Sequence, residues 1–130
     1  GGGHVTAAIH RLAASGLANV LRHEGVLAGE VVTRAQLGRP EPTLLMATEL
    51  EDYLLAPETG YWETFVELGQ RVEAGEPVGR ILFLERVDRA PEVIHARSAG
   101  IVCVVRAIAP TDQGDNVVVV AREADRSELA

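Results

Sequence analysis

The chain has 130 residues with 12 Lys+Arg and 19 Asp+Glu, and its 47% hydrophobic content is that of an ordinary globular protein. A chain of this length supports one substantial core with an appended segment, and it excludes two large domains. The net charge of −7 argues against a nucleic-acid partner, because phosphate backbones are bound mainly by clustered cationic side chains.

All 12 cationic residues are arginine, so the chain contains no lysine. This excludes Schiff-base chemistry, a P-loop lysine and amide attachment of biotin or lipoate within these residues. The single cysteine, Cys103, allows no intrachain disulfide, which fits a reducing compartment, and we expect a cytoplasmic protein. The sequence has no apolar run long enough to cross a bilayer and no signal-peptide pattern, so we expect no membrane partner.

Apolar residues recur close to the helical period between residues 4 and 26, which predicts a short helical segment within residues 1–28. Ser15 and Gly16 interrupt this pattern. Because glycine costs about 1 kcal/mol relative to alanine inside a helix, we predict two short helices that meet at this pair. Gly25 is expected to end the second helix.

The composition changes after the helical segment. Residues 29–43 include Pro40 and Pro42, which suit neither a helix nor a central strand, so they predict a linker. Residues 44–122 contain short apolar runs rich in branched side chains and separated by turn residues, which predicts strands. The charged residues 123–130 are expected to fray.

The strand region contains an internal repeat of two half-motifs, first 40 and then 39 residues apart. Neither half can bury its apolar face alone, so we predict a mainly β fold of two interlocked half-repeats. The pairs that align are Ala56 with Ala96, Gly60 with Gly100, Gly75 with Gly114, Glu76 with Asp115, Val78 with Val117 and Ile81 with Val120.

The repeated glycines have a structural interpretation. A tight turn between strands often needs a positive φ, which glycine adopts without a steric penalty. We therefore predict structural turns rather than ligand contacts at Gly60, Gly75, Gly100 and Gly114.

The candidate contact residues are Tyr61, Trp62 and Glu63, which concentrate two of the few aromatic residues beside an acid. Contact with a ligand or a neighbouring domain is one interpretation of this cluster, and an aromatic plug over the end of the fold is the other. Cys103 lies in an apolar strand, where a buried thiol has a raised pKa and is inert. We identify no catalytic or metal-binding residue, because the spacing of the acids Glu67, Glu73, Glu76, Asp112 and Asp115 matches no acid–base dyad or calcium loop.

The paired half-motifs resemble those of the biotinyl/lipoyl-like, or barrel-sandwich hybrid, domains. The residues that carry this resemblance are Ala56-Pro57-x-x-Gly60, Gly69-x-x-Val72-x-x-Gly75-x-x-Val78-Gly79-x-Ile81 and Ala96-x-x-x-Gly100. A carrier domain of that kind presents a modified lysine between its two halves. The corresponding residues 84–91 contain no lysine, so the expected fold stands but the carrier function is excluded.

Three further features extend beyond the strand region: Gly1-Gly2-Gly3, the motif Gly16-Leu17-x-Asn19-Val20-Leu21-Arg22-x-x-Gly25-Val26-Leu27, and the Ala-Pro-x-x-Gly block with its two glycine-centred turns that follows them. With these features in this order, the chain to about Arg122 resembles the C-terminal portion of the succinylglutamate desuccinylase/aspartoacylase family of zinc-dependent deacylases.

The resemblance implies a zinc ion held by two histidines and a glutamate of an upstream α/β domain, where the metal polarises an amide carbonyl and a carboxylate base activates water. A His-x-x-Glu pair marks that site, and none of His4, His10, His23 and His95 is followed at the third position by glutamate. We therefore expect a fragment that is inactive alone, with zinc bound outside it and residues 1–28 as a remnant of the catalytic domain.

Two hypotheses follow. In the first, the chain is the C-terminal fragment of an N-acyl amino acid deacylase and shapes access to the active site. Its expected partners are the upstream catalytic domain, the small-molecule substrate of the parent enzyme and a second copy in a homo-oligomer. In the second, the chain is a stand-alone barrel-sandwich binding or assembly module without enzymatic activity.

Overall fold

The computed structural model describes residues 6–129 and divides the chain into two compact units, Gly1–Pro42 and Thr43–Ala130. The predicted features at Gly1-Gly2-Gly3 and His4 lie outside the described residues. The described part of the first unit contains one α-helix, and that of the second contains the strands, so the described fold is mainly β with one N-terminal helix.

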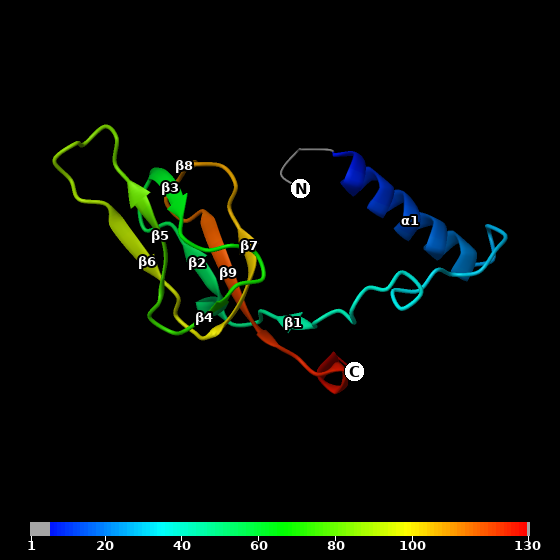
Figure 1. The fold of residues 1–130 in the computed structure, drawn as a ribbon. Coiled ribbons are helices and arrows are strands. Elements are labelled where there is room, and N and C mark those ends of the chain that lie inside the picture. The colour runs from blue at the N-terminus through cyan, green and yellow to red at the C-terminus, as the bar shows by residue number, and fades with distance from the viewer. Residues whose placement is uncertain (1–5, 130) are drawn as a thin grey trace. The chain divides into compact units, whose positions relative to one another are not determined.

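The helix α1 (Ala7–His23) is continuous through Ser15 and Gly16 (Figure 1), so the prediction of two short helices is wrong. Gly16 has no atom within 4 Å of the position that a Cβ would take, which shows that no close packing requires glycine there. The penalty of about 1 kcal/mol for one glycine is too small to break a helix that has good capping at both ends.

Both ends of α1 have capping interactions. The Thr6 hydroxyl accepts a 3.2 Å hydrogen bond from the amide of the third helical residue, which is the usual N-cap geometry. At the other end Gly25 has φ 71°, and the amides of Gly25 and Val26 donate to the carbonyls of Arg22 (3.1 Å) and Leu21 (2.9 Å). This is a Schellman motif, so the expected helix end at Gly25 is observed.

The predicted linker, residues 29–43, is partly ordered against the helix of its own unit. Asn19 of α1 donates to the carbonyl of Val32 (2.8 Å) and accepts from the amide of Val32 (3.0 Å). These two bonds attach the segment to the helix, although no side chain of α1 is buried.

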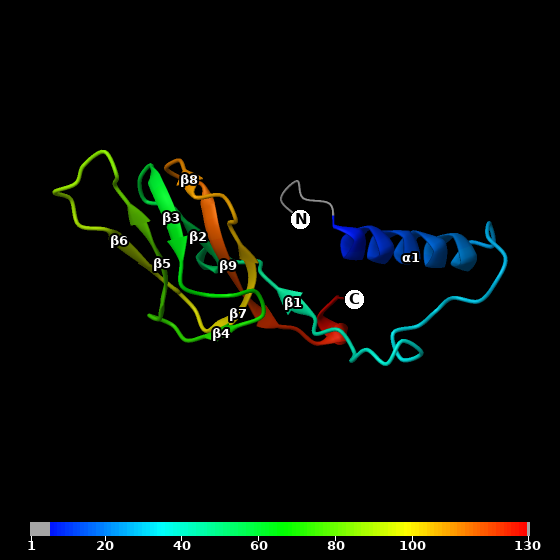
Figure 2. The ribbon, with the colours of Figure 1, turned by 45° about the horizontal axis from the view of Figure 1, so that its top comes forward.

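The second unit consists of antiparallel sheets that form two layers (Figures 1 and 2). In one sheet the order is β1-β9-β7-β4, with β2 also paired to β9; in the other it is β6-β5-β3-β8. The described strands do not close into a barrel. Their bounds are β1 Leu45–Met46, β2 Tyr53–Leu55, β3 Gly60–Thr64, β4 Arg71–Val72, β5 Pro77–Leu82, β6 Glu92–His95, β7 Gly100–Val105, β8 Pro110–Thr111 and β9 Asn116–Glu123.

Each sheet combines strands from both sequence repeats. Strands β2 to β5 come from the first half and β6 to β9 from the second. The pairing of β2 with β9 corresponds to that of β6 with β5, and the pairing of β3 with β8 corresponds to that of β7 with β4. The interlocking of the two halves that the repeat predicts is therefore present in the strand pairing.

Hydrogen bonds outside the strand ladders follow the same two-fold relationship. The Gly75 amide donates to the Ala96 carbonyl (2.8 Å), and the equivalent Gly114 amide donates to the Ala56 carbonyl (2.9 Å). In return, the amide of Ala96 donates to the backbone carbonyl of Glu76 (2.9 Å), and that of Ala56 donates to the backbone carbonyl of Asp115 (2.8 Å). Each half thus closes the turn of the other half.

The core lies between the two sheets and contains branched side chains from both. Its members include the fully buried Val78, Ile81, Val102, Val117 and Val120. β9 contributes a continuous buried run, Val117 to Ala121, which fits a strand covered on both faces.

Local backbone structure is described for residues 123–129, in the segment where fraying is expected. β9 continues to Glu123, and a short 3-10 helix follows at Arg126–Leu129. The carboxylate of Asp125 accepts from the amide of Ser127 (2.8 Å), and Arg122 pairs with Glu128 (2.7 Å). Local hydrogen bonds and one ion pair, rather than apolar contacts, hold this segment.

Candidate functional site

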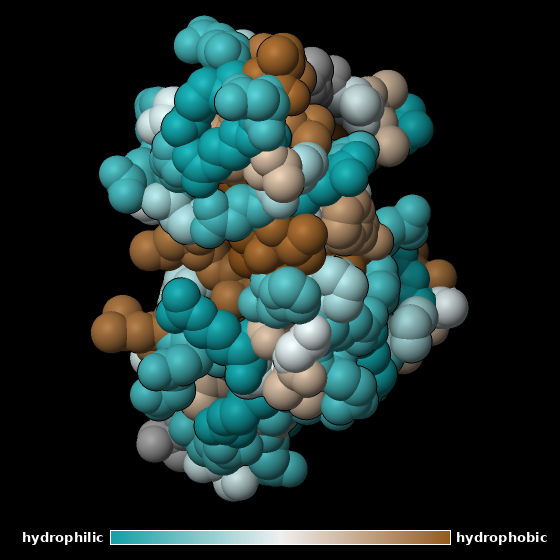
Figure 3. Space-filling model, turned by 90° about the vertical axis from the view of Figure 1, so that its left-hand side faces the viewer, coloured by the Kyte–Doolittle hydropathy of each residue, from teal (hydrophilic) through white to brown (hydrophobic). Residues whose placement is uncertain are grey.

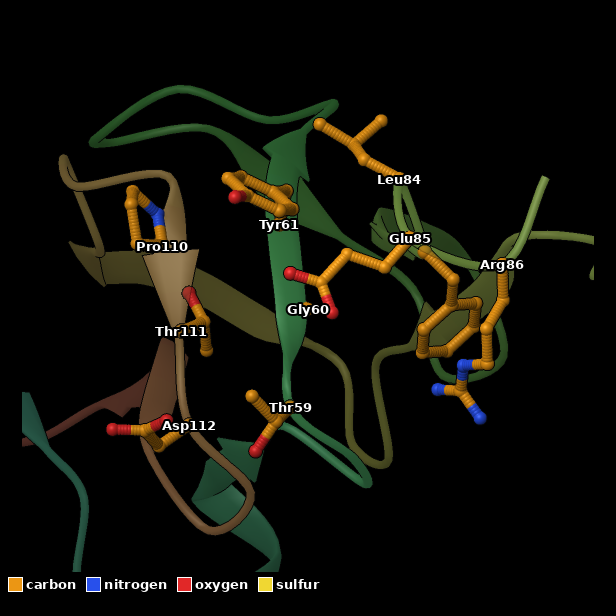
Figure 4. Close-up of a pocket in the computed structure, with 10 residues that line it drawn as sticks. Thr59, Gly60, Tyr61, Leu84, Glu85, Arg86, Pro110, Thr111 and Asp112 are labelled. Atoms are coloured by element: carbon orange, nitrogen blue, oxygen red, sulfur yellow. The ribbon is translucent and has the colours of Figure 1, made fainter.

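The candidate site is a pocket of about 210 Å³ on the β unit, formed by three segments that are distant in sequence. The first segment is the start of β3, the second is the loop after β5, and the third is β8 with the turn that follows (Figure 4). Its lining residues are Thr59, Gly60, Tyr61, Phe83, Leu84, Glu85, Arg86, Pro110, Thr111 and Asp112.

Glu85 extends its side chain across β3, and its carboxylate lies between Tyr61 and Thr59 in Figure 4. Asp112 lies on the β8 side of the same pocket. Neither carboxylate has a hydrogen-bond or ion-pair partner among residues 6–129, and the amide of Asp112 is bonded to Asp115 instead. In Figure 4 the Glu85 carboxylate lies within the pocket, whereas the Asp112 carboxylate points away from Glu85, on the other side of its own strand.

The positive charge of Arg86, in contrast, is compensated. Its guanidinium points away from Glu85 in Figure 4 and pairs with Glu58 at 2.6 Å. Glu58 also pairs with Arg89, which in turn pairs with Glu92 at 3.2 Å. These two arginines and two glutamates, which we call the Glu58 clamp, have no net charge.

The two arginines of the Glu58 clamp pack over an aromatic ring. The guanidinium carbons of Arg86 and Arg89 lie 4.7 and 3.8 Å from the ring centroid of Phe83, which is a cation–π arrangement. The hydrogen bond from Arg86, followed by that from Arg89, lowers the pKa of the Glu58 carboxyl. The clamp therefore fixes the base of the loop after β5, from which Glu85 enters the pocket.

The three predicted contact residues take different positions. Tyr61 is half-buried and lines the pocket. Trp62 points the opposite way into the core, with 5% of its surface exposed and no hydrogen-bond partner for Nε1 in the described structure. Glu63 pairs with Arg80 on the outer face of the sheet. Strand alternation separates Trp62 from Tyr61 and Glu63, because successive side chains of β3 face opposite sides and only that of Trp62 faces the core.

Two of the four repeated glycines have the geometry that the sequence predicts. Gly75 and Gly114 have φ 86° and 87°, and each sits in a turn with open space around its Cβ position. Gly60 and Gly100 begin strands and do not have a positive φ, so backbone conformation is not the reason for glycine at these two positions. They are required because the neighbouring strand comes too close for a side chain: a Cβ on Gly100 would lie 2.6 Å from a backbone oxygen.

The acids beside the turns have a local structural role. The amide of Glu73 donates to the Glu76 carboxylate (2.9 Å), and the amide of Asp112 donates to the Asp115 carboxylate (3.0 Å). The amide of Glu67 donates in the same way to the side chain of Gln70 (3.0 Å). These side chains close turns rather than supply acid–base chemistry.

Histidine and cysteine contribute no site in the described part of the chain. His10, His23 and His95 are exposed, and no three His, Cys, Asp or Glu side chains among residues 6–129 converge as a metal-binding group. Cys103 is half-buried on β7, where burial raises the pKa of its thiol. The described residues therefore do not fit the zinc that the family resemblance implies.

Nothing in the sequence indicated Glu85, Thr59 or Asp112 as neighbours, since the strand register alone brings their segments together. The pocket lining, as the structure describes it, offers no imidazole to activate a nucleophile.

No model of a known protein family matches the chain. Among solved structures, 94% of this chain matches 38% of a succinylglutamate desuccinylase/aspartoacylase from Rhodobacter sphaeroides, with 36% identity and a TM-score of 0.81. A product-bound structure of the ectoine utilization protein EutE (DoeB) from Ruegeria pomeroyi matches 94% of the chain and 36% of its own length, with 30% identity and a TM-score of 0.81. The resemblance to the succinylglutamate desuccinylase/aspartoacylase family is confirmed.

A curated relative agrees with these structures. The chain is 28% identical over 121 residues to an N-alpha-acetyl-L-2,4-diaminobutyric acid deacetylase from Halomonas elongata. The match covers 93% of this chain but 34% of that protein, so the chain spans about a third of the length of the curated relative that it matches. Within residues 6–129, no helix is both long enough and apolar enough to span a membrane.

Proposed function

We propose that this chain is the C-terminal part of an amide hydrolase that removes the acyl group from an N-acyl amino acid. The observation that carries the proposal is the similarity of 94% of the chain to the Rhodobacter sphaeroides protein, at 36% identity and a TM-score of 0.81. Relatives are named as a deacetylase and as a desuccinylase, which supports hydrolysis of a linear amide as the reaction class.

In this proposal the described residues shape access to the active site and leave catalysis to another part of a cytoplasmic enzyme. The support is their lack of a converging metal-ligand group, together with a pocket that suits binding. A zinc ion bound elsewhere in such a hydrolase would supply a Lewis acid that polarises the amide carbonyl and lowers the pKa of its bound water. We assign no step of the hydrolysis to residues 6–129.

We also propose that the β unit is a barrel-sandwich hybrid, which the symmetric pairing of its two halves supports. Contact with a catalytic domain, or with a second copy, is supported by apolar side chains that remain exposed. On α1 these are Ile9, Leu12, Leu17 and Val20. On the face of the β unit drawn in Figure 3, hydrophobic atoms gather in a band across the middle between hydrophilic regions.

The test compares the 130-residue chain with the polypeptide encoded by the complete gene. We expect the complete polypeptide to contain stoichiometric zinc and to hydrolyse Nα-acetyl-2,4-diaminobutyrate or N-succinylglutamate, and we expect the 130-residue chain to do neither. Metal content is measured by elemental analysis, and hydrolysis by release of the free amine. A complete polypeptide without zinc and without activity would contradict the deacylase proposal.

The access role requires a separate test. Residues 43–123 of the complete polypeptide are exchanged for the corresponding segment of a relative that prefers a different acyl group. We expect the ratio of kcat/KM for the acetyl and succinyl substrates to follow the exchanged segment while zinc content stays constant. An unchanged ratio in an active, zinc-loaded chimera would contradict the access role.

The alternative function, a stand-alone binding or assembly module, is supported by one observation. The β unit is a compact unit with its own core, because every buried hydrophobic residue described lies between residues 54 and 121. A native 130-residue product without metal would favour this alternative.

A further inference from the structure

The first unit contains a hollow of about 470 Å³ between α1 and the segment that Asn19 attaches to this helix. Three cationic side chains line the hollow and no acidic one does, and they are Arg11, Arg34 and Arg39. The ion pairs within residues 6–129 are made by other arginines. The arginine hollow, as we call it, therefore has positive charges without a counter-charge in its walls.

The rest of the lining of the arginine hollow suits an apolar side chain. Leu12, Val32 and Leu37 line it, and all three are exposed. Covering these side chains would remove apolar surface from water, and the volume of the hollow accommodates one branched side chain with part of its backbone. A complementary occupant is therefore a protein segment in which an exposed apolar residue is flanked by acids.

The second unit contains such a segment before β2. Leu50 begins a short 3-10 helix that ends at Asp52, and 85% of the surface of Leu50 is exposed. Acidic residues flank it on both sides, Glu49 on one and Glu51 and Asp52 on the other. The side chains of Glu49 and Asp52 form a capping box with each other's backbone, which holds this turn in place. These four residues, which we call the acidic Leu50 segment, thus present one apolar side chain among negative charges.

We propose that the acidic Leu50 segment of one chain docks in the arginine hollow of a second copy, and that two such contacts form a weak homodimer. Charge complementarity supports this pairing: residues 1–42 contain four arginines and three acids, whereas residues 43–130 contain eight arginines and sixteen acids. Because one sequence carries both surfaces, a two-fold arrangement makes the same contact twice and closes. Each contact is small, so the dimer dissociates at low concentration.

The test follows the 130-residue chain by sedimentation velocity at low ionic strength. We expect the mean sedimentation coefficient to rise from that of a monomer toward that of a dimer over about a hundredfold range of concentration, as mass action requires. Added salt is expected to weaken the association, because the charges of both surfaces are exposed and are screened by ions.

A pair of matched variants tests the role of Leu50. Leu50→Ser removes the apolar side chain that enters the hollow, and we expect about tenfold weaker dimerisation, since the central residues of an interface supply most of the affinity. Val87→Ser is the control, because Val87 is 93% exposed in the same unit but lies between Arg86 and Asp88 rather than between acids. We expect this control to change the dimerisation constant by less than about twofold.

Charge reversal tests whether the two surfaces meet. Glu51→Arg alters the acidic Leu50 segment, and Arg11→Glu alters the hollow; Arg11 is preferred to Arg34, whose side chain is held by the Pro40 carbonyl (3.0 Å). Both contacts in a homodimer of either variant bring like charges together, so we expect each variant alone to associate at least about tenfold more weakly. In a mixture of the two variants one contact is native and the other has its charges exchanged, so we expect association at least about fivefold tighter than that of either variant alone.

Circular dichroism of each variant shows whether it is folded. A chain that stays monomeric at every concentration would overturn the proposal, and so would equal weakening by Leu50→Ser and Val87→Ser. A mixture that associates no more tightly than its two components would also overturn it, because it would show that these surfaces do not meet between copies. The deacylase proposal is unaffected by these outcomes, since it is tested by zinc content and hydrolysis in the complete polypeptide.

Discussion

Two glycines of the first half-repeat are required for different physical reasons. A Cβ on Gly60 would lie 2.5 Å from Ile81 Cγ2 and 2.7 Å from the Leu82 carbonyl oxygen, and the backbone atom cannot move without breaking the pairing of β3 with β5. Gly75 has open space at its Cβ position but a φ of 86°. At Gly60 any side chain would clash with the neighbouring strand. At Gly75 a side chain has room, and the residue only has to tolerate a left-handed backbone conformation.

These reasons predict that asparagine destabilises the fold much more at Gly60 than at Gly75. Gly60→Asn is expected to lower the free energy of unfolding by about 2 kcal/mol or more, because overpacking a strand contact usually costs about 1–3 kcal/mol. Gly75→Asn is expected to cost about 1 kcal/mol or less, since asparagine tolerates this position of a type II turn. Urea denaturation of both variants checks the prediction, and equal losses would show that close approach at Gly60 is not the cause.

The Glu58 clamp holds the loop between β5 and β6 through ion pairs. Because these pairs require a charged carboxylate, the contribution of the clamp to stability depends on pH. Pairing with Arg86 and Arg89 favours the charged carboxylate, so the pKa of Glu58 in the folded chain lies below its unfolded value. The contribution of the clamp is therefore fully present above the unfolded pKa and is lost as the pH falls through the folded pKa.

We expect Arg86→Gln to raise the pKa of Glu58 toward its ordinary value, because Arg86 makes the largest contribution to the shift. Arg71→Gln is the matched control, since Arg71 pairs with Glu123 instead. The carboxyl ¹³C shift of Glu58, followed during a pH titration, measures the effect. If Arg86→Gln and Arg71→Gln shifted the titration midpoint of Glu58 equally, the role of the Glu58 clamp would be contradicted.

The sequence predicts the elements better than the site. The interlocked halves are predictable because the repeat places equivalent glycines and apolar residues at equivalent positions, and pairing within one half leaves an apolar face uncovered. The continuity of α1 is missed because the pattern shows Gly16 but not how well Thr6 and Gly25 cap the helix. The pocket is missed because Tyr61 and Glu85 become neighbours only through strand register and a clamp between distant charged residues.

Among residues 6–129, buried side chains are confined to one of the two units. The buried hydrophobic residues of the described chain all lie between residues 54 and 121, whereas α1 buries no side chain. Because the free energy of folding comes mainly from burial of apolar surface, the β unit is expected to fold without residues 1–42.

A truncated chain of residues 43–130 is therefore expected to unfold cooperatively, with the same urea midpoint as the full chain when both are followed by Trp62 fluorescence. Trp62 is suited to this because it is 5% exposed and belongs to the core. Truncation to residues 48–130 is the matched control: it removes β1, whose Leu45 and Met46 pair with Glu123 and Arg122 of β9, and we expect a lower midpoint. A lower midpoint already at 43–130 would show that the helical unit stabilises the β unit through contacts beyond its own burial.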